Sequence, residues 1–69
     1  MLWIPLYGAG SLARFDPATE QFEEIPLPID AAAPYIARYD RGRGVIWIGT
    51  GAADAVLSYE PAARRFRIY

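Results

Sequence analysis

The chain has 69 residues, no cysteine, no histidine, seven basic residues that are all arginine, and a net charge of −1. These numbers exclude a disulfide framework, a thiolate or histidine zinc site, and the basic field that nucleic-acid binding requires. No apolar run reaches the roughly 20 residues of a membrane helix and no signal-peptide pattern opens the chain, so we expect a soluble protein, cytoplasmic or periplasmic.

The first predicted elements are three strands. Residues 2–4 form a short apolar run, and residues 11–15 follow a Gly-rich connection. An Asp-Pro turn at residues 16–19 then folds the chain back, because Pro presets φ and Asp can accept a hydrogen bond from the turn. Residues 21–25 alternate Phe with charged side chains, as an outer strand with one wet face does.

A proline-rich link at residues 26–33 separates these strands from four more. The four are expected at 34–40, 45–48, 55–59 and 65–69, with a Gly-rich turn after Asp40. No segment keeps the 3.6-residue apolar periodicity of a helix, so the predicted class is all-β and antiparallel.

An internal repeat organises these strands. Residues 2–25 align with residues 46–69 without a gap, a shift of 44 positions that pairs Trp3 with Trp47 and Phe22 with Phe66. A period of about 40 to 45 residues is typical of a four-stranded propeller blade. We therefore predict a partial propeller, in which residues 1–28 form a blade that lacks its innermost strand and residues 34–69 form a complete blade.

A core of this size contributes only about 3 to 5 kcal/mol, so stability is expected to come from further polypeptide. Two whole repeats would need about 88 residues, which makes ring closure by identical copies difficult. We expect the chain to be part of a longer propeller whose remaining blades are its partners, with self-association as the alternative.

The strand pattern resembles the blade consensus of the streptogramin (virginiamycin B) lyase family. The resemblance covers most of the chain and is carried by residues 2–4 (LWI), 7–10 (YGAG), 14–19 (RFDPAT), 22–28 (FEEIPLP) and 34–37 (PYIA). It implies a bacterial seven-bladed propeller and, for the lyase itself, metal-assisted opening of a cyclic depsipeptide. The second copy, residues 47–50 and 59–61, is also similar to the sensor propellers of two-component regulators.

The chain differs from that family in the residues that the lyase reaction requires. The family's lyase reaction depends on histidine, a carboxylate and a divalent metal, and this chain has no histidine. No catalytic residue can therefore be assigned here, and no cofactor or metal is expected in this chain. A divalent metal, if the parent is an enzyme, is implied for the missing blades.

The candidate ligand-binding residues are Tyr7, Asp30 and Asp54. Tyr7 follows an inner strand at a Gly-rich turn, and the two aspartates lie in connections where propellers place ligands. Each also has a structural interpretation as an ordinary turn residue. The remaining candidates are assigned to structure: Asp16, Asp40 and Glu60 as turn caps, and Trp3 and Trp47 as core between sheets.

Two functions follow from these expectations. The first is a fragment of a streptogramin lyase-like propeller that binds a small peptide-like ligand without catalysing a reaction by itself. The alternative is a noncatalytic sensor or protein-interaction propeller. A third interpretation, a self-assembling repeat, predicts a solution mass that is a multiple of 7.7 kDa.

Overall fold

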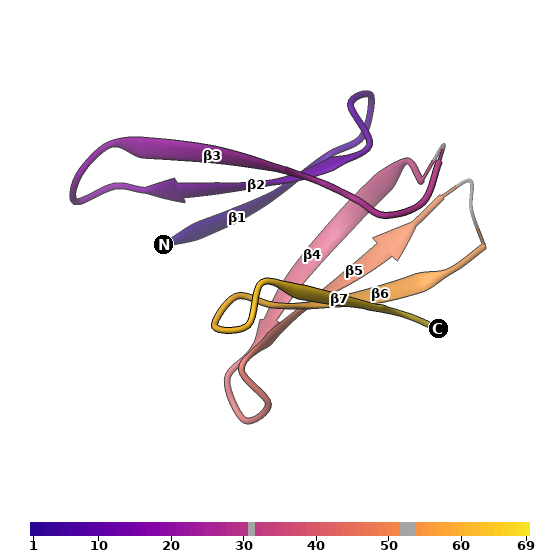
Figure 1. Cartoon of the computed structure of the whole chain (residues 1–69). Coiled ribbons are helices and arrows are strands. Elements are labelled where there is room, and N and C mark those ends of the chain that lie inside the picture. Colours follow the sequence, from indigo (N-terminus) through magenta and orange to yellow (C-terminus); the bar gives the residue numbers. More distant parts are fainter. Residues whose placement is uncertain (31, 52–53) are drawn as a thin grey trace.

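The computed structural model describes residues 1–30, 32–51 and 54–69. It has seven antiparallel strands in two sheets and, within those residues, no helix (Figure 1). The predicted all-β class and the predicted strands are confirmed. Ala31, in the predicted link, lies outside the described residues. Sheet A contains β1 (Leu2–Leu6), β2 (Ser11–Asp16) and β3 (Gln21–Pro26); sheet B contains β4 (Pro34–Asp40), β5 (Val45–Thr50), β6 (Val56–Glu60) and β7 (Arg65–Ile68).

The two sheets share one strand register. Each strand pairs with its neighbours in chain order, so sheet A runs β1-β2-β3 and sheet B runs β4-β5-β6-β7. In sheet A, Leu2 lies opposite Phe15; in sheet B, Ile46 lies opposite Tyr59, 44 positions later in both strands. Every paired position of β5, β6 and β7 repeats a pair of β1, β2 and β3 in this way. The repeat seen in the sequence is therefore also a repeat of the hydrogen-bonded structure.

The tight loops of the hairpins share one backbone conformation at their last residue. Loops 7–10, 17–20, 41–44 and 61–64 each end on a residue with positive φ, which turns the chain into the next strand. Glycine fills this position twice, where it costs no steric strain. The four residues are Gly10 (φ 64°), Glu20 (59°), Gly44 (66°) and Arg64 (51°).

Because side chains alternate across a strand, each sheet has two faces, which we name after their residues. The tryptophan face of sheet A carries Trp3, Pro5, Leu12, Arg14, Glu23 and Ile25, and that of sheet B carries Trp47, Gly49, Val56, Ser58 and Arg67, with Tyr69 just beyond β7. The isoleucine face of sheet A carries Leu2, Ile4, Ala13, Phe15, Phe22 and Glu24, and that of sheet B carries Ile46, Ile48, Leu57, Tyr59, Phe66 and Ile68.

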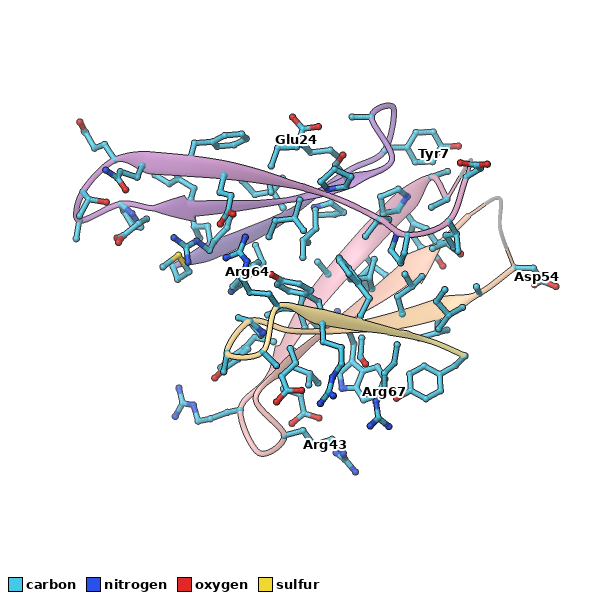
Figure 2. All side chains as sticks on the ribbon, in the orientation of Figure 1. Tyr7, Glu24, Arg43, Asp54, Arg64 and Arg67 are labelled. Atoms are coloured by element: carbon cyan, nitrogen blue, oxygen red, sulfur yellow. The ribbon has the colours of Figure 1, made fainter. Side chains whose placement is uncertain are left out.

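The core lies between unlike faces. The tryptophan face of sheet A packs on the isoleucine face of sheet B, with Leu12 and Ile25 against Ile46, Ile48 and Leu57. Figure 2 agrees with this arrangement: Glu24 and Arg67 point outward on opposite sides of the pair of sheets, and Arg64 lies between the sheets. Each sheet thus has one covered face and one open face.

The two tryptophans were both predicted to lie in the core between sheets, but only Trp3 lies there. Trp3 is half-buried between the sheets, with its ring centroid 6.2 Å from that of Tyr59, which confirms the prediction. Trp47 lies on the open tryptophan face of sheet B, 5.7 Å from the Tyr69 ring, so its placement between sheets was wrong for this chain. The physical reason is that no further sheet covers that face within the described residues.

Candidate functional site

Three connections that carry the predicted ligand-binding residues lie at one end of the molecule. These are loop 7–10 between β1 and β2, the link from β3 to β4, and the connection from β5 to β6 (Figure 1). The hairpin loops 17–20, 41–44 and 61–64 lie at other corners of the sheets. We call this end the loop end.

Backbone hydrogen bonds tie these connections to one another. Leu27 N–H donates to the Gly10 carbonyl (3.1 Å), which joins the link to loop 7–10. Gly51 N–H donates to the Ala33 carbonyl (3.0 Å), which joins the link to the connection after β5. Both bonds cross between segments far apart in sequence, so the loop end has a defined geometry.

Two exposed tyrosines flank Gly51 at the loop end. A β-carbon added to Gly51 would lie 3.7 Å from Tyr35 Cδ1 and 3.8 Å from Tyr7 Cε2. A β-carbon at Gly51 would therefore be in ordinary van der Waals contact with both rings, which places the two tyrosines next to the same residue. Tyr7 is 64% exposed and Tyr35 is 62% exposed, so both phenols are open to a ligand.

Tyr35 reaches this position because β4 is irregular at its start. The register between β4 and β5 shifts between Pro34 and Ile36, so Tyr35 has no regular partner on β5. An extra residue in a strand re-aims its side chain. The bulge therefore directs the ring over Gly49 and Gly51.

Asp54 borders a hollow beside Tyr35. The hollow has a volume of about 300 Å³, and Gly49, Thr50, Ala55, Val56 and Tyr69 also line it. The Thr50 hydroxyl donates to the Ala55 carbonyl (2.6 Å) and accepts from Ala55 N–H (3.2 Å), which closes the connection around Asp54. Asp54 has φ 54° and corresponds to Gly10 in the repeat, so the turn interpretation also has structural support.

Asp30 lies in the exposed turn of the link from β3 to β4, and that link belongs to the loop end (Figure 1). The structure thus brings the three predicted residues to one end of the molecule. Within the described residues, it shows no direct contact among their side chains. Figure 2 shows Tyr7 and Asp54 on this side, with the Asp54 carboxylate pointing into solvent.

The loop end is acidic. Its connections contain Asp30 and Asp54 but none of the seven arginines, which lie at residues 14, 38, 41, 43, 64, 65 and 67. Two carboxylates and two exposed phenols at one end of the molecule favour a cation or an aromatic group.

The other predicted carboxylates belong to turns. Asp16 Oδ1 accepts from Ala18 N–H (3.0 Å) and Asp40 Oδ1 accepts from Arg43 N–H (3.2 Å), so both predicted turn caps are confirmed. Glu60 instead accepts from Arg65 Nη2 (3.0 Å) across the β6–β7 pair. Asp16 and Asp40 therefore hold turns together by backbone hydrogen bonds.

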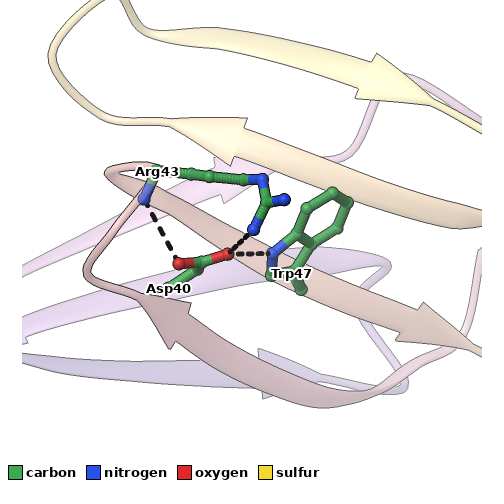
Figure 3. Close-up of polar contacts among 3 residues, drawn as sticks. All are labelled: Asp40, Arg43 and Trp47. Carbon is green, nitrogen blue, oxygen red and sulfur yellow. Dashed lines mark hydrogen bonds and ion pairs between the residues drawn. The ribbon is translucent and has the colours of Figure 1, made fainter.

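Asp40 also holds Trp47 in place (Figure 3). Its Oδ2 accepts from Trp47 Nε1–H (3.0 Å) and from Arg43 Nη1 (3.1 Å). These hydrogen bonds, led by that from Trp47, favour the charged carboxylate and lower the pKa of Asp40. The pair belongs to the open tryptophan face, and Asp40 lies at the end of β4 opposite to Tyr35.

Within residues 1–30, 32–51 and 54–69, no three carboxylates gather as metal ligands. None of these residues forms a helix that could cross a membrane. The residues that sequence reasoning missed as a pair are Tyr35 and Gly51. The sequence shows a glycine at 51 and a proline before Tyr35. Only the bulge in β4, however, brings Tyr35 to the same glycine as Tyr7.

We compared the chain with models of protein families, with curated proteins and with solved structures, and found no match in any of the three comparisons.

Proposed function

We propose that this chain forms consecutive blades of a β-propeller similar to the streptogramin lyase-like proteins, and that its loop end binds a small peptide-like ligand without catalysing a reaction by itself. The observation that carries the ligand site is the pair of exposed tyrosines on either side of Gly51. The propeller is supported by the 44-residue repeat of strand register and by the packing of successive sheets through unlike faces.

The chemistry of the loop end favours a ligand with a cationic or aromatic side chain. Tyr7 and Tyr35 offer ring faces and phenol hydroxyls, while Asp30 and Asp54 supply negative charge. The chain's own residues would bind and orient such a ligand. They include no histidine and, among the described residues, no carboxylate cluster to serve as a metal centre.

A titration with cyclic peptides tests this proposal. Three peptides with the same ring would carry arginine, phenylalanine or glutamate at one position, and binding would be followed by chemical-shift changes of the Tyr7 and Tyr35 ring signals. We expect the arginine peptide to bind tightest and the glutamate peptide weakest. Equal shifts for all three peptides, or no shifts, would contradict the proposal.

Gly51→Val is the blocking variant, because its side chain would enter the space between the two rings. It should reduce binding of the arginine peptide about tenfold, the effect of one lost contact of about 1.4 kcal/mol. Tyr39→Ala is the matched control, since Tyr39 is equally exposed (57%) but borders a separate hollow beside Trp3 and Pro61. Tyr39→Ala should leave binding unchanged.

A noncatalytic sensor or protein-interaction role is the second candidate, favoured by the openness of the loop end. Phenols exposed by more than 60% suit a protein surface as well as a small molecule. A linear protein segment would then bind more tightly than the cyclic peptide with the same side chain, and this comparison separates the two functions.

A further inference from the structure

The two open faces of the molecule repeat the faces that form its core. Inside the chain, the tryptophan face of sheet A covers the isoleucine face of sheet B. The faces left open are the tryptophan face of sheet B and the isoleucine face of sheet A. One copy therefore presents counterparts of both halves of its own internal interface, at opposite sides of the molecule (Figure 2), although sheet A has no strand that corresponds to β4.

Both open faces carry exposed apolar side chains. On sheet A, Leu2 is 54% exposed and Phe22 58% exposed. On sheet B, Val56 is 46% exposed and Tyr69 61% exposed. A hollow of about 290 Å³ beside Trp47 and Ser58 adds room for an inserted side chain. Exposed apolar side chains gathered on one face are typical of an interaction site.

An exposed ion pair that bridges the two sheets gives a residue-level test of the match. Arg64, at the end of loop 61–64, donates from Nη2 to Glu23 Oε2 (2.5 Å) across the two sheets. The repeat replaces Glu23 by Arg67 on the open face of sheet B, and replaces Arg64 by Glu20 beside the open face of sheet A. The charges are thus exchanged at both positions together, so they remain complementary.

Local structure at these two positions also repeats. Glu20 has φ 59° and Arg64 has φ 51°, so both end their loops in the same conformation. Within residues 1–30, 32–51 and 54–69, neither Glu20 nor Arg67 forms an ion pair, whereas Arg64 and Glu23 do. The aromatic residues of this contact repeat as well: Trp3 and Tyr59, which meet between the sheets, correspond to Trp47 and Phe15 on the two open faces.

We propose that the chain self-associates head to tail, with the tryptophan face of sheet B in one copy on the isoleucine face of sheet A in the next, through a charge-exchanged Arg67–Glu20 ion pair. The interface is heterologous, so it generates rings or open chains rather than closed two-fold dimers. Val56 and Tyr69 of the tryptophan face of sheet B also line the hollow beside Asp54. The Arg67–Glu20 ion pair and its test do not involve the tyrosines of the ligand site proposed above.

Charge reversal tests the proposal on the full chain. The solution mass of the wild type should rise with concentration from about 1 μM to about 1 mM in sedimentation and light scattering, a range that covers ordinary interfaces. Arg67→Glu and Glu20→Arg should each raise the midpoint concentration about tenfold at low salt, because each sets like charges against one another. Arg41→Glu, the same charge change in the exposed loop 41–44, should have little effect.

Mixing the two single variants gives the decisive result. In an equimolar mixture, every junction between unlike copies again sets one positive charge against one negative charge, so association should return to the wild-type midpoint. The double variant Glu20→Arg/Arg67→Glu should also associate as the wild type does. Far-UV circular dichroism of each variant checks that the sheets are intact.

Two results would overturn the proposal. A wild type that stays at 7.7 kDa throughout this range assigns the open faces to another polypeptide. Association that persists in both single variants, or that the mixture does not restore, assigns it to a different surface. Phe22→Glu provides a second approach, because Phe22 is exposed in the folded chain; it should abolish association without unfolding the sheets.

Discussion

Sheets A and B have the same strand register but unequal burial. On the isoleucine face, Ile46 and Ile48 of sheet B are fully buried, while their counterparts Leu2 and Ile4 in sheet A are 54% and 37% exposed. The residues are apolar at both sites and pair across the strands in the same way. Burial is therefore set by whether another sheet covers the face, and not by the local pattern.

The tryptophan faces show the reverse difference. Ile25 in sheet A is 8% exposed, whereas its counterpart Tyr69 in sheet B is 61% exposed. Leu12 is fully buried, whereas its counterpart Val56 is 46% exposed. The core thus uses the tryptophan face of sheet A and the isoleucine face of sheet B. Each sheet leaves open the face that corresponds to the one that its partner contributes to the core.

Truncation of the paired positions Ile46 and Leu2 should show this difference most strongly. Ile46→Ala should lower the free energy of unfolding by about 2 to 5 kcal/mol, because it leaves a cavity in the core. Leu2→Ala should change it by less than about 1 kcal/mol, since much of that side chain is already in water. Urea unfolding followed by circular dichroism measures both, at a concentration where the chain is monomeric.

A milder variant keeps the comparison measurable if Ile46→Ala unfolds the chain completely. Ile46→Val should cost about 0.5 to 1.5 kcal/mol and leave a measurable transition. Similar losses for Ile46 and Leu2 variants would mean that both faces are covered in solution, which contradicts the monomer described here.

Gly49 differs from its counterpart Pro5 by its contact with β4, a strand that sheet A lacks. A β-carbon at Gly49 would lie 2.5 Å from Ile36 Cγ2, so one of the two must shift. Gly49→Ala should therefore destabilise the fold by about 1 to 3 kcal/mol, the usual cost of overpacking. Thermal unfolding by calorimetry measures the change.

Gly8→Ala is the matched control for Gly49, because nothing lies within 4 Å of a β-carbon at Gly8. It should be neutral or stabilise the chain by up to about 1 kcal/mol through the unfolded state. An unaltered stability in Gly49→Ala would show that Ile36 moves aside freely.

The strands and their register could be predicted from the sequence because both depend on local pattern. Alternation of Phe with charged residues at 21–25, and the alignment of Trp3 with Trp47, led directly to paired strands in the observed order. Asp30 and Asp54 could likewise be assigned to connections. These features need no knowledge of how one sheet lies on another.

The choice of the covered face could not be predicted. Both faces of each sheet carry large apolar side chains, so a period of two residues does not distinguish them. Trp47 was therefore assigned to the core by its likeness to Trp3, although it lies on an open face. That Tyr7 and Tyr35 lie next to the same glycine could not be predicted for a related reason, because it depends on a bulge and on a glycine distant in sequence.

Gly10 and Asp54 occupy the same position of the repeat, and both have the positive φ of a left-handed turn. Gly10→Ala should cost about 1 to 2 kcal/mol, since a β-carbon is strained at φ 64°. Asp54→Gly relieves the same strain and should be neutral or stabilising by about 0.5 kcal/mol. Chemical denaturation measures both, and a stability loss in Asp54→Gly would show instead that the Asp54 side chain supports the connection.

The smallest expected effect is a pH response that separates Trp47 from Trp3. Trp47 Nε1–H donates to Asp40, whereas Trp3 has no such carboxylate partner among the described residues. The hydrogen bonds from Trp47 and Arg43 lower the pKa of Asp40 below its ordinary value. Because the pKa is lowered in the folded chain, its stabilising contribution is full above the unfolded pKa of about 4 and is lost as pH falls through the folded pKa.

Nuclear magnetic resonance of the two indole N–H signals follows this titration directly. The Trp47 signal should shift with a midpoint below pH 4, the ordinary value for aspartate being about 3.9, while the Trp3 signal stays constant. Asp40→Asn should remove the shift, because a neutral amide does not titrate. A Trp47 midpoint at or above the ordinary value would mean that the indole hydrogen bond does not form in solution, and that Trp47 is held on the open face by Tyr69 alone.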